Sequence, residues 1–178
     1  AHLAEVEVDE LTGETKVTRY VAVQDVGFAI NPASVDAQIH GGVSQGIGWA
    51  LYEGMSYDSE GQLLTATLMD YALPRASDLP EIVVDFVPTR SPTNPLGAKG
   101  GGESGTIGAP PAVVNAVVDA LRPFGVAHLD MPIRAEAISA IALEKMNKCC
   151  MQIAKTDRET FVRRRETVRQ SDQERGTI

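Results

Sequence analysis

The start of the chain alternates apolar and polar positions, as a strand with one buried face does. The alternation runs over residues 2–9 and returns over residues 16–24, after turn residues at 11–14. This pattern predicts a β-hairpin over residues 3–24. Because a lone hairpin is only marginally stable in water, we expect it to pair with further structure.

After the hairpin, the spacing of apolar residues changes to that of helices. Residues 34–53 predict a helix with Ser34 as its N-cap, although this stretch contains four glycines. Residues 111–122 predict a second helix, opened by Pro110-Pro111, since proline suits the first helical turn. Its apolar side chains recur at the spacing of a buried helix face. They are Val113, Val114, Ala116, Val117, Ala120 and Leu121.

Shorter apolar stretches complete the pattern. Residues 55–58 and 63–68 predict two strands around a turn, 81–87 predicts an alternating strand, and 126–129 predicts a short one. A further helix is expected over residues 134–146. Strands and helices in this order predict an α+β fold, with mixed sheets and helices packed on their faces.

Composition narrows the class of protein. The chain has 178 residues, of which 43% are hydrophobic, and this is enough for the core of one domain. Its net charge of −8 argues against a nucleic-acid partner. No apolar run approaches the roughly 18 residues of a membrane span. Cys149 and Cys150 are adjacent and lack metal-ligand spacing, so we expect a reducing, cytoplasmic setting.

The two ends of the sequence differ in character. Residues 1–143 have the patterns of a folded domain, whereas residues 144–178 form a charged tail that we expect to be helical or disordered. The first strand pattern begins at once, at Ala1-His2 and without a methionine. We therefore expect the sequence to be a fragment of a larger subunit.

A glycine-dense loop holds a single carboxylate. Four of the seven residues from Gly97 to Glu103 are glycines. The loop could be a flexible connector with a solvated glutamate. It could instead cradle an anion with backbone N–H groups and Lys99, although the lysine precedes the glycines and the loop is no P-loop. Glu103 could also be a general base in a partly desolvated pocket. The residues alone leave all three open.

The first predicted helix also allows two interpretations. Its glycines at residues 41–48 could permit close packing of a neighbouring element, or they could let a ligand reach the backbone. Gln38 and Gln45 are seven residues apart and therefore share one helical face, where their amides could bind such a ligand. His40 has no partner at i+4 and is expected to be a packed or surface histidine.

Five segments together resemble a known family. They are GAKGGGE (97–103), TIGAPPA (106–112), DVG (25–27), NP (31–32) and QIHGGVSQGIG (38–48). Their order and their sequences are similar to those of the C-terminal molybdopterin-binding domain of molybdenum hydroxylase large subunits. This family includes xanthine dehydrogenase, aldehyde oxidase and aerobic carbon monoxide dehydrogenase.

The resemblance implies roles for individual residues. Glu103 would be the catalytic base beside the molybdenum, and the reaction would oxidise the substrate with water-derived oxygen. No side chain of this chain is expected to ligate the metal. The implied cofactor-binding residues are Gln38, Gln45, Lys99, Gly100, Gly101 and Gly102.

The resemblance also implies cofactors and partners. The cofactor would be molybdenum-molybdopterin in its cytosine dinucleotide form, held together with a preceding molybdopterin-binding domain of the same subunit. A 2Fe-2S small subunit and an FAD medium subunit would be the partners, and the substrate a small molecule. The chain alone is expected to be inactive. The alternative is a non-catalytic binding or assembly module that retains the fold.

Overall fold

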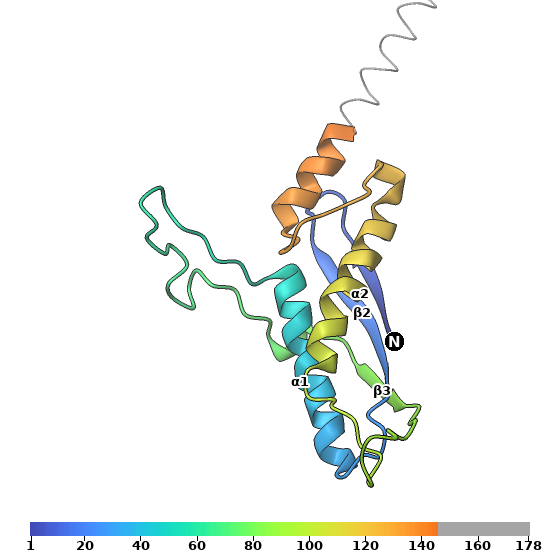
Figure 1. Ribbon diagram of the computed structural model, residues 1–178. Coiled ribbons are helices and arrows are strands. Elements are labelled where there is room, and N and C mark those ends of the chain that lie inside the picture. Colours follow the sequence, from blue (N-terminus) through green and yellow to red (C-terminus); the bar gives the residue numbers. More distant parts are fainter. Residues whose placement is uncertain (146–178) are drawn as a thin grey trace, which may run out of the picture. The chain divides into compact units, whose positions relative to one another are not determined.

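The computed structural model describes residues 1–145, and Figure 1 shows the arrangement of the elements. Three strands form one sheet in the order β1-β2-β3, with β1 His2–Val8, β2 Thr15–Gln24 and β3 Ile82–Phe86. β1 pairs antiparallel with β2, and β3 pairs parallel with β2. The predicted hairpin, the predicted strand at 81–87 and the mixed sheet of an α+β fold are confirmed.

Two helices lie side by side against this sheet (Figure 1). They are α1 Pro32–Leu51 and α2 Ser104–Ala120. Because β2 and β3 are parallel, the chain needs a long crossover between them, and this crossover contains α1. The core lies between the sheet and the helices. Its fully or almost fully buried members include Val17, Tyr20, Ala22, Ile39, Val43, Ile47, Ala109, Val113, Val117 and Leu121.

Glycines allow α1 and α2 to approach closely. A Cβ atom placed on Gly46 would lie 2.6 Å from the Cβ of Ala109. One placed on Gly105 would lie 2.7 Å from the Ile39 carbonyl oxygen. No side chain fits at these distances, and Gly42 is in the same contact. The packing interpretation is therefore confirmed for Gly42 and Gly46.

The predicted start of α1 was wrong by a few residues. Asn31, rather than Ser34, is the N-cap, and its side-chain oxygen accepts a hydrogen bond from the Ser34 N–H at 3.2 Å. Pro32 follows as the first helical residue, where its missing N–H costs nothing.

The predicted start of α2 was wrong by more. The helix begins at Ser104, so Pro110 and Pro111 lie inside it instead of opening it. The Ile107 N–H already donates to the Glu103 carbonyl oxygen at 3.0 Å. Glu103 is consequently the N-cap residue of α2 and not a residue in the middle of a loop.

The segment from residue 52 to residue 75 forms an extended arm (Figure 1). The strands predicted at 55–58 and 63–68 do not form, and an isolated bridge joins Tyr57 to Leu63. Neither stretch has a neighbouring strand of the sheet to pair with. The arm leaves several large apolar side chains exposed: Met55, Tyr57, Leu64, Leu68, Met69 and Leu73.

The chain after α2 has little regular structure before residue 135. A short 3₁₀ helix follows α2 at Arg122–Phe124. A similar one lies earlier in the chain, at Ala76–Asp78, just before β3. The strand predicted at 126–129 does not form.

The chain divides into two compact units, residues 1–139 and 140–178. Residues 135–139 of the first unit are helical, and so are residues 140–145 of the second. The rest of the tail lies outside the described residues, so the division at residue 143 and the character of the tail stay predictions. Within residues 1–145, no helix is long and apolar enough to cross a membrane.

Candidate functional site

One face of α1 points away from the core. Gln38, Gly41, Gln45 and Trp49 are exposed and follow one another at helical spacing, whereas Ile39, Val43 and Ile47 of the opposite face are buried. The two glutamines thus lie on one accessible face, as their spacing predicted. We call these four exposed residues the α1 stripe.

A cavity of about 530 Å³ separates the α1 stripe from the start of α2. We call it the glutamate cavity, because Glu103 forms part of its wall. Its lining residues are Ala37, Gln38, Gly41, Gly42, Gln45, Trp49, Gly102, Glu103, Thr106 and Ile107. Residues from two motifs far apart in the sequence therefore meet at one hollow.

The side chain of Glu103 is available for chemistry. It makes no capping hydrogen bond with α2, although the residue occupies the N-cap position. Glu103 is exposed, so the described residues alone do not form the partly desolvated pocket expected from the sequence. The reason is that the glutamate cavity is open on one side.

Two glycines leave bare backbone on the wall of the glutamate cavity. A Cβ atom placed on Gly41 or on Gly102 would meet no atom within 4 Å. Neither residue has a positive φ, so neither backbone conformation nor packing requires glycine there. Gly101 differs, because a Cβ there would lie 2.5 Å from a methyl carbon of Val26.

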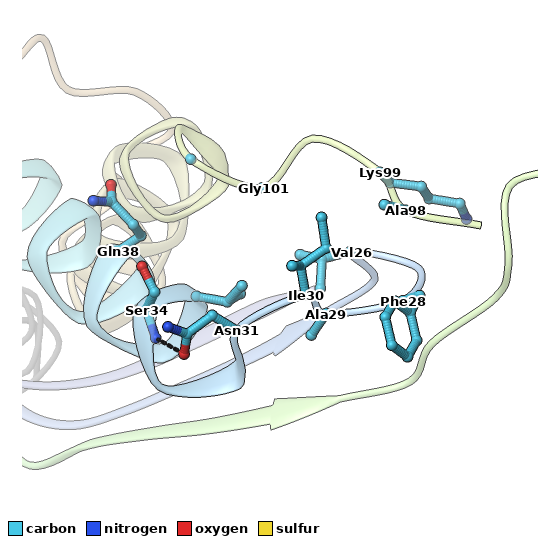
Figure 2. A pocket seen from close by; sticks show the side chains of 12 residues that line it. Val26, Phe28, Ala29, Ile30, Asn31, Ser34, Gln38, Ala98, Lys99 and Gly101 are labelled. Atoms are coloured by element: carbon cyan, nitrogen blue, oxygen red, sulfur yellow. Dashed lines mark hydrogen bonds between the residues drawn. The ribbon is translucent and has the colours of Figure 1, made fainter. Parts of the chain in front are cut away.

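A neighbouring pocket of about 270 Å³ shares Gln38 and Gly102 with the glutamate cavity. Figure 2 shows Gln38 on α1 opposite the segment that carries Gly101, with the Lys99 side chain running away from both. The lining of this neighbouring pocket is Val26, Phe28, Ala29, Ile30, Asn31, Ser34, Val35, Gln38, Ala98, Lys99, Gly101 and Gly102. The two hollows adjoin at Gln38 and Gly102.

The ammonium group of Lys99 is bound within the protein. It donates to Asp25 Oδ2 at 2.7 Å and to Thr89 Oγ1 at 2.7 Å. Lys99 and the Thr89 donors hold the pKa of the Asp25 carboxyl well below its usual range. Lys99 lines the neighbouring pocket but not the glutamate cavity, and Gly100 lines neither.

Comparison with known proteins gives these features a context. The family described as "Molybdopterin cofactor-binding domain" matches residues 1–80. The carbon monoxide dehydrogenase large chain of Hydrogenophaga pseudoflava is 47% identical over 131 residues, which are 74% of this chain and 16% of that protein. The nicotine 6-hydroxylase large subunit of Paenarthrobacter nicotinovorans is 44% identical over 137 residues, covering 77% of this chain and 17% of that protein.

A solved structure agrees with these sequences. The quinoline 2-oxidoreductase of Pseudomonas putida 86 is 48% identical, with a TM-score of 0.78 over 80% of this chain and 18% of that chain. The chain belongs to the molybdenum hydroxylase large-subunit family. It spans between 16% and 18% of the length of these three relatives.

The match to the molybdopterin-binding domain covers only some of the residues predicted for the site. Gln38 and Gln45 lie inside the matched range of residues 1–80, whereas Lys99 and Glu103 lie beyond it. The wall contributed by α1 is thus the part that the cofactor-binding description covers.

The glutamate cavity suits a molybdopterin cofactor. Gln38 and Gln45 offer amide groups that can both donate to and accept from a heterocycle. Gly41 and Gly102 let a ligand approach the backbone, since a Cβ atom placed on either would meet no atom of residues 1–145 within 4 Å. Within residues 1–145, no group of three or more His, Cys, Asp or Glu side chains could hold a metal ion.

Sequence reasoning missed several residues that line the glutamate cavity. Trp49 lies one helical turn beyond Gln45, and this i, i+4 spacing could have placed it on the same face. Ile107 was missed because α2 was expected to begin after it. His40 lies as predicted among packing contacts, with its ring nitrogens each 3.0 Å from a carbonyl oxygen, those of Asp36 and Ile82.

Proposed function

We propose that this chain is the part of a molybdenum hydroxylase large subunit that binds the molybdopterin cofactor and supplies the catalytic base. The whole enzyme would be a molybdenum-dependent oxidoreductase that oxidises a small-molecule substrate with water-derived oxygen. The observation that carries the proposal is that Glu103 and Gln38 line one cavity whose walls include the bare backbone of Gly41 and Gly102.

Binding would begin at the shared wall of the two hollows. Gln38 contacts both the glutamate cavity and the neighbouring pocket, so its amide can anchor the pterin. Gln45 would bind from the same helical face, and the backbone at Gly101 and Gly102 from the opposite wall. Because the two hollows adjoin, the site suits an elongated ligand, which supports a dinucleotide form of the cofactor. That the base is cytosine rests on the family resemblance. Gly100 stays a prediction from the resemblance.

Glu103 would act as the base in the glutamate cavity. When bound, the cofactor supplies the two-electron oxidation of the substrate. The Glu103 carboxylate makes no helix-capping hydrogen bond and is exposed in the cavity, so it is free to accept a proton at a carboxylate oxygen.

Other parts of the enzyme would complete the site. The glutamate cavity is open, and its rim carries the exposed apolar side chains of Trp49 and Ile107. We propose that the preceding molybdopterin-binding domain of the same subunit covers this rim and excludes water. A 2Fe-2S small subunit and an FAD medium subunit would take the electrons, in a cytoplasmic complex. This chain alone would therefore show no turnover.

Glu103→Gln in the full-length subunit of the assembled enzyme tests the role of the base. The amide keeps the shape of the side chain but cannot accept the proton, so turnover should fall by about 10²- to 10⁴-fold. The molybdenum content should not change. Glu60→Gln, in an exposed turn of the arm, is the matched control and should leave both unchanged. Unchanged turnover in Glu103→Gln would favour the non-catalytic binding or assembly module.

Gln38→Ala tests the binding role separately. Removal of the amide shared by the two hollows should lower molybdenum occupancy about tenfold, as the loss of one hydrogen bond to a buried ligand would. Occupancy is measured as metal per assembled subunit. Normal occupancy in this variant would remove Gln38 from the binding site.

A further inference from the structure

We propose that Asp25, Thr89 and Lys99 form a clamp that positions the glycine segment Gly100–Gly102. Lys99 would then act through Asp25 as a positioning residue and not as a contact to the cofactor. This inference rests on the proposed function, because the segment that it positions forms a wall of the glutamate cavity.

The polar groups of the clamp bind one another. Lys99 Nζ donates to Asp25 Oδ2 and to Thr89 Oγ1, both at 2.7 Å. The other carboxylate oxygen, Asp25 Oδ1, accepts from the backbone N–H of Gly27 at 2.9 Å and of Thr89 at 3.0 Å. The Thr89 hydroxyl also contacts Asp25 Oδ2. The positive charge of Lys99 is thus paired with the Asp25 carboxylate inside the clamp. Within residues 1–145, the structure therefore gives no sign that Lys99 binds an anion elsewhere.

Backbone contacts tie the same two loops together. The Lys99 N–H donates to the Val26 carbonyl oxygen at 2.9 Å, and the Phe28 N–H donates to the Gly97 carbonyl oxygen at 2.9 Å. A Cβ atom on Gly27, whose φ is +60°, would lie 2.2 Å from the Gly97 carbonyl oxygen. The loop after β2 and the glycine loop therefore run as a short antiparallel pair that ends at Lys99.

Beyond Lys99 the chain has few anchors until α2. Cβ atoms on Gly100 and Gly102 would meet no atom of residues 1–145 within 4 Å, whereas one on Gly101 would lie 2.5 Å from a methyl carbon of Val26, the residue after Asp25. The Ser104 hydroxyl donates to the Gly101 carbonyl oxygen at 2.9 Å, which ties the far end to the helix. A segment without side chains takes its path largely from its two ends. One end is α2, and the other is the clamp.

The clamp should act locally. The side chains of Lys99 and Asp25 are 35% and 37% exposed, and pairs as exposed as this add little to the stability of a whole domain. A small displacement of the glycine segment has larger consequences, since a misplacement of about 1 Å at a reacting group can cost about 100-fold in rate. Gly102 lines both hollows and immediately precedes Glu103, so it would transmit the displacement.

A double-mutant cycle separates positioning from direct contact. Lys99→Met, Asp25→Asn and the double variant are made in the full-length subunit of the assembled enzyme. Each single variant should lower kcat by roughly tenfold with molybdenum content retained, and the double variant should be no slower than either. Lys99→Arg, which keeps the charge, should restore part of kcat. A far larger loss of molybdenum in Lys99→Met than in Asp25→Asn, with effects that multiply, would overturn the proposal.

Amide hydrogen exchange of residues 97–103 tests the clamp without reference to catalysis. Exchange should become roughly tenfold faster in Lys99→Met and in Asp25→Asn. Arg19→Met breaks another exposed ion pair, Glu5–Arg19 at 3.6 Å, and should leave exchange in this loop unchanged.

The two measurements distinguish the clamp from the proposed function. Faster exchange in Lys99→Met and Asp25→Asn, together with full turnover in Glu103→Gln, would uphold the clamp and overturn the role of Glu103 as the base. Exchange at the wild-type rate together with an inactive Glu103→Gln would overturn the clamp alone.

Discussion

Two groups of glycines serve opposite purposes in this domain. At the contact of α1 and α2, Gly46 and Gly105 have protein atoms so close that a Cβ would lie 2.6 Å and 2.7 Å from its nearest neighbours. At the glutamate cavity, Gly41 and Gly102 face empty space. The first group brings two helices together, whereas the second exposes backbone to a hollow.

The difference shows how to separate structural from functional glycines. Gly41 and Gly42 are adjacent in the sequence and both line the glutamate cavity, yet a Cβ atom on Gly42 would lie 2.8 Å from the backbone nitrogen of Thr106 in α2, whereas one on Gly41 would meet no atom of residues 1–145 within 4 Å. A glycine in a helix costs up to about 1 kcal/mol against alanine. Closer packing offsets this cost at Gly42, but nothing in residues 1–145 offsets it at Gly41. A ligand is the explanation that we propose.

The largest expected effect concerns Gly105, one of the glycines at the contact of α1 and α2. Gly105→Ala would press a methyl group against the Ile39 carbonyl oxygen, so the helices must separate. Overpacking of this kind costs about 1–3 kcal/mol, and we expect a loss of this size in the free energy of unfolding. Urea denaturation of the full-length subunit measures it. Wild-type stability would mean that the helices are not in close contact there.

The next largest effect concerns Gly102, one of the glycines at the glutamate cavity. Gly102→Val adds a side chain where no atom of residues 1–145 interferes, so the fold should persist. The affinity for the cofactor, titrated as molybdenum bound per subunit, should fall about tenfold, equivalent to about 1.4 kcal/mol. Gly100→Val is the comparison, because its Cβ also meets open space but the residue lines neither hollow. It tests the prediction from the resemblance that Gly100 also binds the cofactor, and a smaller loss than in Gly102→Val would confine binding to the lining residues. Equal losses in the two variants would show that contact with the cofactor is not confined to the lining residues.

A smaller effect of opposite sign is expected at Gly41. Gly41→Ala meets no atom within 4 Å and removes a poor helix former. The free energy of unfolding of the cofactor-free subunit should therefore rise by about 0.5–1 kcal/mol. A decrease would show that residue 41 contacts another part of the subunit even without cofactor.

The smallest expected effect is that of pH on the glycine loop, whose protection against amide exchange should stay constant. The pKa of Asp25 is lowered from its usual 3.8, so its contribution is complete above that value and is lost only as the pH falls below it. Protection of the loop amides against exchange should thus be constant from about pH 8 to about pH 5. A fall in protection near neutral pH would mean that another group controls the loop.

Local patterns were sufficient for much of the fold. The hairpin and β3 follow from alternation of apolar residues, and the buried face of α2 from Val113, Val117 and Leu121. The start of α2 was misplaced because Pro110-Pro111 resembled a first turn. The structure accommodates these prolines inside the helix next to Gly46, where a side chain would come within 2.9 Å of the Pro110 ring.

The site depended more on contacts that local spacing does not contain. The shared face of Gln38 and Gln45 follows from helical geometry, but the approach of Glu103 to that face depends on how α1 and α2 pack. The partner of Lys99 is Asp25, far away in the sequence, so from the residues alone an anion-binding role for the lysine stayed one of the open alternatives. The arm at residues 52–75 lacks its predicted strands because no neighbouring strand is there to pair with them.

The most direct test of the account is the position of the metal in the assembled enzyme. Crystals of the holoenzyme give anomalous scattering at the molybdenum absorption edge, which locates the metal independently of the protein. The account predicts a peak at the glutamate cavity, within direct or one-water reach of the Glu103 carboxylate, with the pterin against Gln38. A peak elsewhere, with Glu103 facing only solvent, would contradict it.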